Sequence, residues 1–180
     1  LTTRQEAPEP IRKFIPELPK SSGLSLEQFN FDKVVKNSDV IFLALPHTTA
    51  AGLGGKILKR KKIVIDLSAD FRLKQTSQYK SWYGFTHPSP QWVKKAVYGL
   101  PECYREQLRN ANLIANPGCY STGAILALKP LISHRLVDCS RLVIDAKSGV
   151  SGAGRKLAAA TQFCEVDENF GAYKVNRHQH

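Results

Sequence analysis

Four short apolar runs punctuate the chain, at residues 40–45, 63–67, 113–115 and 142–146. Each is rich in β-branched or large aliphatic side chains and is too short for a core helix, which predicts four strands. The first run is continuous and ends at Pro46. We therefore expect it to form a strand that is buried on both faces, as in parallel sheets.

Helices are expected beside these strands. Residues 48–59 leave room for a short helix between the first two runs, although three glycines there each cost about 1 kcal/mol relative to Ala. After Cys119, apolar residues recur at i, i+1, i+4, i+7 and i+8, which predicts an amphipathic helix over 121–133. Strands alternating with helices in this way predict βαβ units and a parallel sheet, hence an α/β fold.

Two stretches show no regular period. Residues 1–38 contain four prolines and a Ser-Ser-Gly sequence, so little regular structure is expected there. Residues 71–101 are rich in proline and aromatic side chains, and we expect an ordered but irregular excursion. No internal repeat or low-complexity tract divides the chain.

The chain is strongly basic, with 26 Lys and Arg against 15 Asp and Glu and a net charge of +11. Such a surface favours anionic partners, either nucleic acid or phosphorylated metabolites. The densest basic run, residues 59–62, directly precedes the second apolar run and is typical of a solvated turn. No aromatic residues interleave with it, so it does not resemble a platform for single-stranded nucleic acid.

The sequence gives no sign of a membrane span or a secretory signal, because no run approaches about 18 apolar residues and residues 1–10 lack a basic-then-apolar pattern. It contains no Met, so we expect a piece of a longer protein. The four cysteines are far apart and form no Cys-x-x-Cys pair, which argues against a metal site or a disulfide scaffold. A reducing setting is expected, either the cytoplasm or an organelle of a eukaryote.

In parallel sheets, chemistry gathers beyond the carboxyl ends of the strands. Polar residues do follow each apolar run, at 46–47, 68–72, 116–119 and 147–149. These positions are therefore the first candidates for a functional site.

Cys119 stands in the most informative of these segments. Residues 116–122 lead from a predicted strand through Pro117-Gly118 into a predicted helix, which puts the thiol near a helix N-terminus. Free N–H groups and the helix dipole favour an anion there, which lowers a cysteine's pKa and makes a reactive thiolate. The same N–H groups can stabilise an oxyanion. A buried, unreactive cysteine is the alternative.

A thiol nucleophile usually needs a base. His178 and His180 are the candidates for this base, and a pair of surface histidines or a cloning remnant is the alternative. His47 follows the first strand and can line the same crevice. Residues 148–154 form a loop of glycines and serines that can approach a ligand closely, although it matches neither nucleotide-binding glycine motif and a plain turn is the alternative.

Taken together, several stretches resemble the N-acetyl-gamma-glutamyl-phosphate reductase family, in the same order along the chain. The resemblance covers nearly everything from about residue 39 onward. The matching stretches are 42–47, 64–72, 98–102, 115–120, 145–156, 165–169 and 178–180.

The resemblance implies catalytic roles and an architecture. Cys119 would be the nucleophile that forms a thioester from an acyl phosphate, and His180 or His178 the acid/base, of which we favour His180. Residues 1–118 would be a Rossmann-like NADP-binding domain that lacks its first strand and Gly-rich loop. Residues 119–180 would begin an α+β catalytic and dimerisation domain.

The resemblance also implies a cofactor site and partners. Thr3 and Arg4 would hold the 2′-phosphate of NADP, and Pro46 with His47 would line the cofactor. A further group would lie close to the nicotinamide: Ser148, Gly149, Ser151 and Gly152. We expect a homodimer or homotetramer acting on a small acyl phosphate, with no metal, nucleic-acid or membrane partner.

Other functions stay open. A related aminoadipyl-phosphate reductase would share everything outside the substrate pocket. Aspartate semialdehyde dehydrogenase shares the chemistry, but its usual cysteine context differs from Asn-Pro-Gly-Cys-Tyr. A basic nucleic-acid-binding module would bind more weakly as salt rises and leaves the Cys119 turn unexplained. A catalytically inactive fragment is the last alternative.

Overall fold

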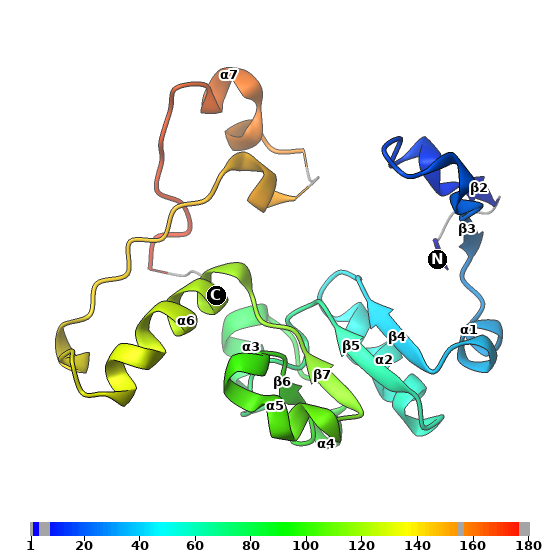
Figure 1. The fold of residues 1–180 in the computed structure, drawn as a ribbon, viewed down its shortest axis with the longest axis horizontal. Helices are drawn as coiled ribbons and strands as arrows, with labels where there is room; N and C mark the ends of the chain where they lie inside the picture. The colour runs from blue at the N-terminus through cyan, green and yellow to red at the C-terminus, as the bar shows by residue number, and fades with distance from the viewer. Residues whose placement is uncertain (1, 4–7, 155–156, 177–180) are drawn as a thin grey trace.

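The computed structural model describes residues 2–3, 8–154 and 157–176 (Figure 1). Its strands are β1 (Thr2–Thr3), β2 (Glu9–Pro10), β3 (Ser25–Gln28), β4 (Val40–Leu43), β5 (Ile63–Asp66), β6 (Val97–Tyr98) and β7 (Leu113–Ala115). Its helices are α1 (Phe31–Asn37), α2 (Thr49–Lys59), α3 (Ser77–Tyr83), α4 (Pro90–Val93), α5 (Pro101–Arg109), α6 (Cys119–Ser133) and α7 (Phe163–Val166). Short 3₁₀ turns add to these at η1 (Ile11–Lys13), η2 (Lys20–Ser22), η3 (Cys139–Arg141), η4 (Val150–Ala153) and η5 (Ala159–Thr161).

A four-stranded parallel sheet forms the centre of the molecule, in the order β4-β5-β7-β6. Val64 of β5 aligns with Leu113 of β7, and Val97 of β6 aligns with Ile114. The runs at 40–45, 63–67 and 113–115 therefore do form strands, as predicted, and the predicted α/β fold is confirmed. Because all strands run in one direction, their carboxyl ends meet at one edge.

Strand β4 is covered on one face only. Ile41 and Leu43 are buried in the core, whereas Val40 and Phe42 are 43% and 63% exposed. The prediction that this strand is buried on both faces is therefore wrong. Its continuous apolar run fits a two-sided core, but β4 is the outer strand of the sheet, and its second face stays open in the described part of the chain.

Helix α2 forms despite its three glycines, and packing explains why. Other segments pack closely against α2 at Gly54 and Gly55, and both glycines are buried. A Cβ at Gly54 would lie 3.1 Å from the Phe71 ring, and one at Gly55 would lie 2.6 Å from Ser89 Oγ. Tertiary contact thus outweighs a helix propensity that is unfavourable by about 1 kcal/mol per glycine.

The segment 71–101 is more regular than predicted, because it holds α3, α4 and β6. Its aromatic rings pack on one another: the Tyr79 and His87 centroids are 4.8 Å apart, and those of Phe71 and His87 are 5.2 Å apart. Tyr79 is fully buried, and its hydroxyl accepts the Leu73 N–H at 3.0 Å. Sequence periodicity does not show such a cluster, because its helices are only one or two turns long.

The N-terminal part is also more regular than predicted. β1 and β3 pair in parallel, β2 and β3 pair antiparallel, and α1 follows with Asn30 as its N-cap, whose side chain accepts the Lys33 N–H at 2.9 Å. This small sheet lies apart from the four-stranded sheet (Figure 1). Its strands are too short to give a readable alternation of polar and apolar residues.

The chain beyond β7 packs differently. Helix α6 begins at Cys119, two residues earlier than predicted, and none of the described residues after Gly118 is buried. The predicted strand at 142–146 is wrong: no strand forms there, and Val143 is 93% exposed. A strand needs a neighbour to pair with, and none lies beside this run in the described chain. The division at 118/119 stays a prediction.

Candidate active site

Cys119 lies at the first position of α6, at the carboxyl edge of the parallel sheet. Gly118 is the N-cap residue, with φ −73° and ψ 157°, and it is buried together with Pro117, while Cys119 itself is exposed. The Gly118 carbonyl oxygen accepts the Thr122 N–H at 2.9 Å and the Thr122 hydroxyl at 2.8 Å. The structure therefore places the thiol at a strand–turn–helix junction, as the sequence predicted.

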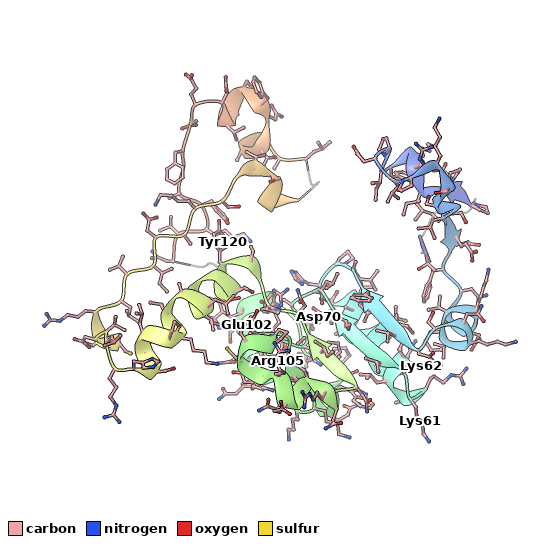
Figure 2. The ribbon with its side chains drawn as sticks, viewed as in Figure 1. Lys61, Lys62, Asp70, Glu102, Arg105 and Tyr120 are labelled. Atoms are coloured by element: carbon pink, nitrogen blue, oxygen red, sulfur yellow. The ribbon has the colours of Figure 1, made fainter. Side chains whose placement is uncertain are left out.

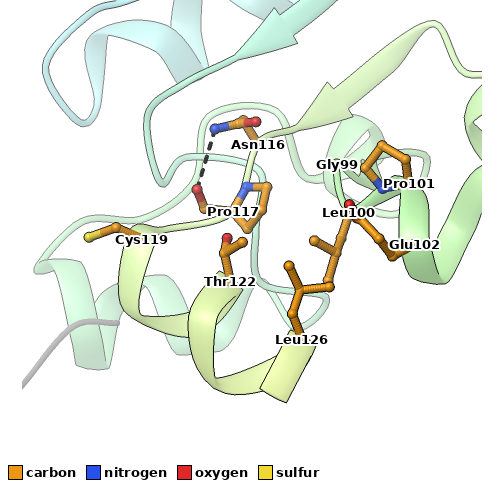
Figure 3. Close-up of a pocket in the computed structure, with 9 residues that line it drawn as sticks. All are labelled: Gly99, Leu100, Pro101, Glu102, Asn116, Pro117, Cys119, Thr122 and Leu126. Carbon is orange, nitrogen blue, oxygen red and sulfur yellow. Dashed lines mark hydrogen bonds between the residues drawn. The ribbon is translucent and has the colours of Figure 1, made fainter. Parts of the chain in front are cut away.

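An open cavity of about 600 Å³ lies beside the thiol. Figure 3 shows Cys119 and Asn116 on one side, and Leu100, Pro101 and Glu102 on the other. The walls combine backbone turns with a few polar groups, which suits a small polar ligand. The lining residues are Gly99, Leu100, Pro101, Glu102, Asn116, Pro117, Cys119, Thr122 and Leu126.

A buried carboxylate network continues this edge beyond β5. Asp66, the last residue of β5, is fully buried and accepts the Ser68 N–H at 3.0 Å and the Ser68 hydroxyl at 2.9 Å. Ser68 Oγ in turn accepts the Asp70 N–H at 3.1 Å. Burial raises the pKa of Asp66, and the hydrogen bonds from Ser68 oppose that rise. The network fixes the backbone that follows β5.

Asp70 caps helix α2. Its fully buried carboxylate accepts the Thr48 N–H at 3.1 Å and the Ala51 N–H at 2.8 Å, and the positive end of the helix dipole stabilises its charge (Figure 2). Thr48 adopts φ 74°, a region that β-branched residues rarely occupy and that costs about 1–3 kcal/mol. Asp70 therefore holds a strained turn and occupies two of the N–H groups at the start of α2.

His47 lies at the carboxyl end of β4, with its side chain about half exposed (51%). Its Nδ1 accepts the Ala69 N–H at 3.2 Å, so the 3.8 Å approach of Nδ1 to Asp70 Oδ1 is not a hydrogen bond. The ring meets Tyr83 edge-on at 5.4 Å, and burial raises the pKa of Tyr83. An oriented, accessible ring at this position can lie against a flat ligand.

Three residues at this edge had no predicted role: Asp66, Asp70 and Arg72. Asp66 lies near the end of the second predicted strand, and Asp70 and Arg72 lie in the segment that follows it. That position was the available signal, but the Asp70 carboxylate reaches N–H groups 19 and 22 residues away, and Arg72 reaches Asn116, 44 residues away.

The predicted loop at 148–154 does not reach this cavity. Ser148, Gly149, Ser151 and Gly152 lie in or next to the exposed turn η4, and none of them lines the Cys119 cavity. A Cβ at Gly152 would collide only with Ser148 Oγ, the end of an exposed side chain that can rotate away. Their role at the nicotinamide stays a prediction.

The remaining predicted residues are only partly described. Arg4, His178 and His180 lie outside the described residues, and Thr3 is described only as part of β1. Near the C-terminal end, the Tyr173 hydroxyl donates to the Tyr120 hydroxyl at 2.8 Å, and this bond raises the pKa of Tyr173 to about 12. The Tyr173 segment therefore contacts the residue next to Cys119.

Other features bear on the excluded functions. All four cysteines are free, and the described residues include no group of three His, Cys, Asp or Glu side chains that could hold a metal. None of the helices in the described ranges is long and apolar enough to span a membrane. Lys61 and Lys62 precede β5, at the end of the sheet away from Asp70 (Figure 2), so the basic run is a turn distant from the site.

The parallel sheet and the thiol at its carboxyl edge define an α/β protein with a candidate covalent site. A family model described as the semialdehyde dehydrogenase NAD-binding domain matches residues 1–111, and one described as the semialdehyde dehydrogenase dimerisation domain matches residues 119–180. The chain therefore belongs to the semialdehyde dehydrogenase family, whose first domain binds a nicotinamide dinucleotide.

Similar proteins extend this comparison. Proteins of Desulforamulus reducens and Pelotomaculum thermopropionicum, both named N-acetyl-gamma-glutamyl-phosphate reductase, are each 47% identical to the whole chain. The chain spans about half of their length (52%). A solved structure of aspartate semialdehyde dehydrogenase II from Vibrio cholerae is 20% identical over 62% of this chain and 32% of its own, with a TM-score of 0.41. That similarity is weak and adds nothing to the family assignment.

At the carboxyl edge of the sheet, the end of β4 fits a nicotinamide dinucleotide, whereas the first turn of α2 does not fit a cofactor phosphate. The half-exposed His47 ring, beside Pro46 at the end of β4, leaves a surface where dinucleotides bind in such sheets. The first turn of α2 fits a cofactor phosphate poorly, because Asp70 already accepts two of its N–H groups and brings a negative charge.

Proposed function

We propose that the whole protein reduces N-acetyl-glutamyl 5-phosphate to N-acetylglutamate 5-semialdehyde with NADPH, in arginine biosynthesis. The observation that carries the proposal is the exposed Cys119 thiol at the N-terminus of α6, beside an open cavity. The relatives at 47% identity over the whole chain, which bear the reductase name, supply the substrate.

In this reaction the Cys119 thiolate attacks the acyl carbon. The carbon–oxygen bond to phosphate breaks, phosphate leaves with the electron pair, and a thioester to Cys119 remains. The N–H groups at the start of α6 are placed to stabilise the oxyanion formed in the attack. After reduction of the thioester carbon, the carbon–sulfur bond breaks, which releases the aldehyde and regenerates the thiolate. The one proton that the overall reaction takes up ends on the released phosphate.

The cofactor supplies the hydride when bound. Pro46 and His47 would line it, Thr3 and Arg4 would hold the 2′-phosphate that distinguishes NADP from NAD, and the loop at 148–154 would lie close to the nicotinamide. NADP is therefore the proposed cofactor.

His180, with His178 as the alternative, is proposed as the group that moves the proton near Cys119. The match of residues 119–180 to a dimerisation domain supports a homo-oligomer. Free thiols at all four cysteines support a reducing compartment, and we place the protein in the cytoplasm.

The test follows NADP reduction by full-length protein with N-acetylglutamate 5-semialdehyde and phosphate. Cys119→Ser should lower kcat by more than about 10³-fold, because the oxygen nucleophile cannot replace the thiolate. Cys139→Ser removes a thiol that is also exposed and should stay within about twofold of wild type. A parallel assay with NAD reads the cofactor preference.

Other outcomes would redirect the assignment. Turnover with the aminoadipate semialdehyde alone would move the protein to the related lysine route. Full activity in Cys119→Ser would remove Cys119 as the nucleophile, and no turnover by wild type with either aldehyde would favour an inactive protein.

A further inference from the structure

Arg72 joins two backbone segments at the carboxyl edge of the sheet. Its Nε–H donates to the Asn116 carbonyl oxygen at 2.6 Å, and its Nη2–H donates to the Leu67 carbonyl oxygen at 3.1 Å. The guanidinium is partly buried, and it spans 44 residues of sequence to reach Asn116. Both acceptors are main-chain oxygens, so the bridge fixes backbone positions.

The bridge begins where the ladder between β5 and β7 ends. Asp66 and Ala115 are the last aligned pair, and the Asn116 N–H still donates to the Asp66 carbonyl oxygen at 2.9 Å. Beyond this bond no further backbone hydrogen bond joins the two segments among the described residues. The Arg72 side chain supplies the next link, because it binds the carbonyl oxygens of both Leu67 and Asn116.

The Asn116 carbonyl is close to the thiol along the chain. Pro117 fixes its own φ near −65°, and both Pro117 and Gly118 are buried, so the turn has little freedom. At its far end the Gly118 carbonyl is tied to Thr122 of α6. The position of Asn116 therefore determines where Cys119 lies relative to the sheet.

From this geometry we infer that Arg72 is a positioning residue for Cys119, and that its bridge to Leu67 and Asn116 sets the thiol in line for attack. The inference rests on the proposed function, in which Cys119 is the nucleophile. A guanidinium presents several N–H donors in a rigid plane, whereas a Lys ammonium is a flexible point charge, so Lys does not replace Arg at such a bridge.

The chemical step that isolates this role contains no phosphate. In the reverse direction, Cys119 adds to the semialdehyde, hydride passes to NADP, and one equivalent of NADPH appears with the thioester. An Arg72 that only bound the phosphate group would not affect this burst. An Arg72 that positions the thiol controls it.

The experiment measures the burst of NADPH absorbance in full-length protein mixed with NADP and N-acetylglutamate 5-semialdehyde, without phosphate. Arg72→Ala should slow the burst about 10²-fold, the usual effect of a displacement near 1 Å, and leave the KM for NADP unchanged. Arg72→Lys should remain within about tenfold of Arg72→Ala, because it keeps the charge but loses the planar donors. Millimolar guanidinium chloride should partly restore the burst in Arg72→Ala.

The matched control is Lys74→Ala. Lys74 is a nearby cation that also donates to a backbone carbonyl, that of Ala96 at 2.7 Å, but it lies outside the Cys119 turn. Its loss should change the burst by less than about twofold. If Lys74→Ala slows the burst as much as Arg72→Ala does, the effect is general loss of structure and the inference is wrong.

Two further results would overturn the inference. A normal burst in Arg72→Ala together with a raised KM for phosphate would make Arg72 a phosphate ligand. Unchanged alkylation of Cys119 by iodoacetamide, read by peptide mass spectrometry against Cys139, would show that the turn does not depend on the bridge. The alkylation result needs no turnover, so it separates failure of the bridge from failure of the proposed function, which a missing burst in wild type would reveal.

Discussion

His87 is held by backbone groups on both sides of its ring. Nε2 donates to the Asp70 carbonyl oxygen at 2.8 Å, and Nδ1 accepts the Ser89 N–H at 3.0 Å, which assigns the proton of the neutral ring to Nε2. Burial lowers the pKa of His87, and the bond to Asp70 opposes that shift. A second proton on the ring would have to bind Nδ1, where it would meet the Ser89 N–H and break that hydrogen bond.

Acid should therefore destabilise the protein through His87. The folded pKa lies below the unfolded value of 6.5, so its stabilisation is complete above 6.5 and is lost as pH falls through the folded pKa. Urea unfolding of the full-length protein at pH 7.5 and pH 5, values chosen to bracket about 6.5, measures this loss. His87→Gln should flatten the acid slope by at most one proton.

His134→Gln is the control for that experiment, because His134 is exposed and should leave the slope unchanged. Asp66 titrates in the opposite sense, since its raised pKa favours the protonated folded state, but it is present in every variant and cancels in the comparison. An equal acid slope in wild type and His87→Gln would contradict the role of His87.

For single residues, the sequence predicted those features that depend only on adjacent residues in the chain. Cys119 follows a strand end and Pro117-Gly118, which together imply a helix N-terminus. The Asp70 carboxylate accepts N–H groups 19 and 22 residues away, and Arg72 reaches Asn116, 44 residues away, so no local pattern shows these contacts. These contacts exist only once the parallel strands have brought their carboxyl ends together.

At the scale of the elements, helix α2 offers two glycines at which substitution by Ala should change the stability in opposite directions. Gly52 has open space around the position of a Cβ, so Gly52→Ala should stabilise the protein by about 0.5–1 kcal/mol through helix propensity. Gly55→Ala should instead cost about 1–3 kcal/mol, because its Cβ would lie 2.6 Å from Ser89 Oγ. Urea unfolding measures both changes.

The double variant Gly55→Ala with Ser89→Ala identifies the cause. It removes the oxygen that the new Cβ would meet, while the next contacts, at 3.4 Å, are ordinary. Most of the lost stability should return. A Gly55→Ala protein as stable as Gly52→Ala would mean that the close approach of α2 to Ser89 is wrong.

Helices and strands were predicted well where the local sequence pattern agrees with the packing. They were predicted poorly where the structure of a segment depends on a pairing partner elsewhere in the chain. The strands β5 and β7 were read correctly because both are inner strands of the sheet. The run 142–146 has the same composition but no partner in the described chain, so it remains an exposed, extended segment. One-sided burial of β4 likewise depends on which elements pack on its two faces, and the run of apolar residues does not show them.

At the scale of the whole molecule, burial is uneven. The core residues lie between Val35 and Ala115, and the described chain after Gly118 contains no buried residue. Local stability follows buried contact, so these two parts should open with very different free energies.

Limited trypsin digestion of the 180-residue chain should therefore cut first after Arg141, the exposed last residue of η3, or after Lys147, in exposed irregular backbone. Lys59 and Lys61 are an internal control, because both are exposed but lie at the end of α2 and in the tight turn between α2 and β5. Mass spectrometry of the first fragments reads the order. Early cuts within residues 63–115 would contradict this distribution of stability.

The strand order β4-β5-β7-β6 has a consequence for a chain that grows from its N-terminus. β6 leaves the ribosome before β7, yet β7 is its partner in the described sheet and separates it from β5. The central sheet can close only after Ala115 has emerged, and Cys119 follows directly. In a nascent chain, the turn that carries Cys119 can therefore take its place at the edge of this sheet only after β7 has joined β5 and β6.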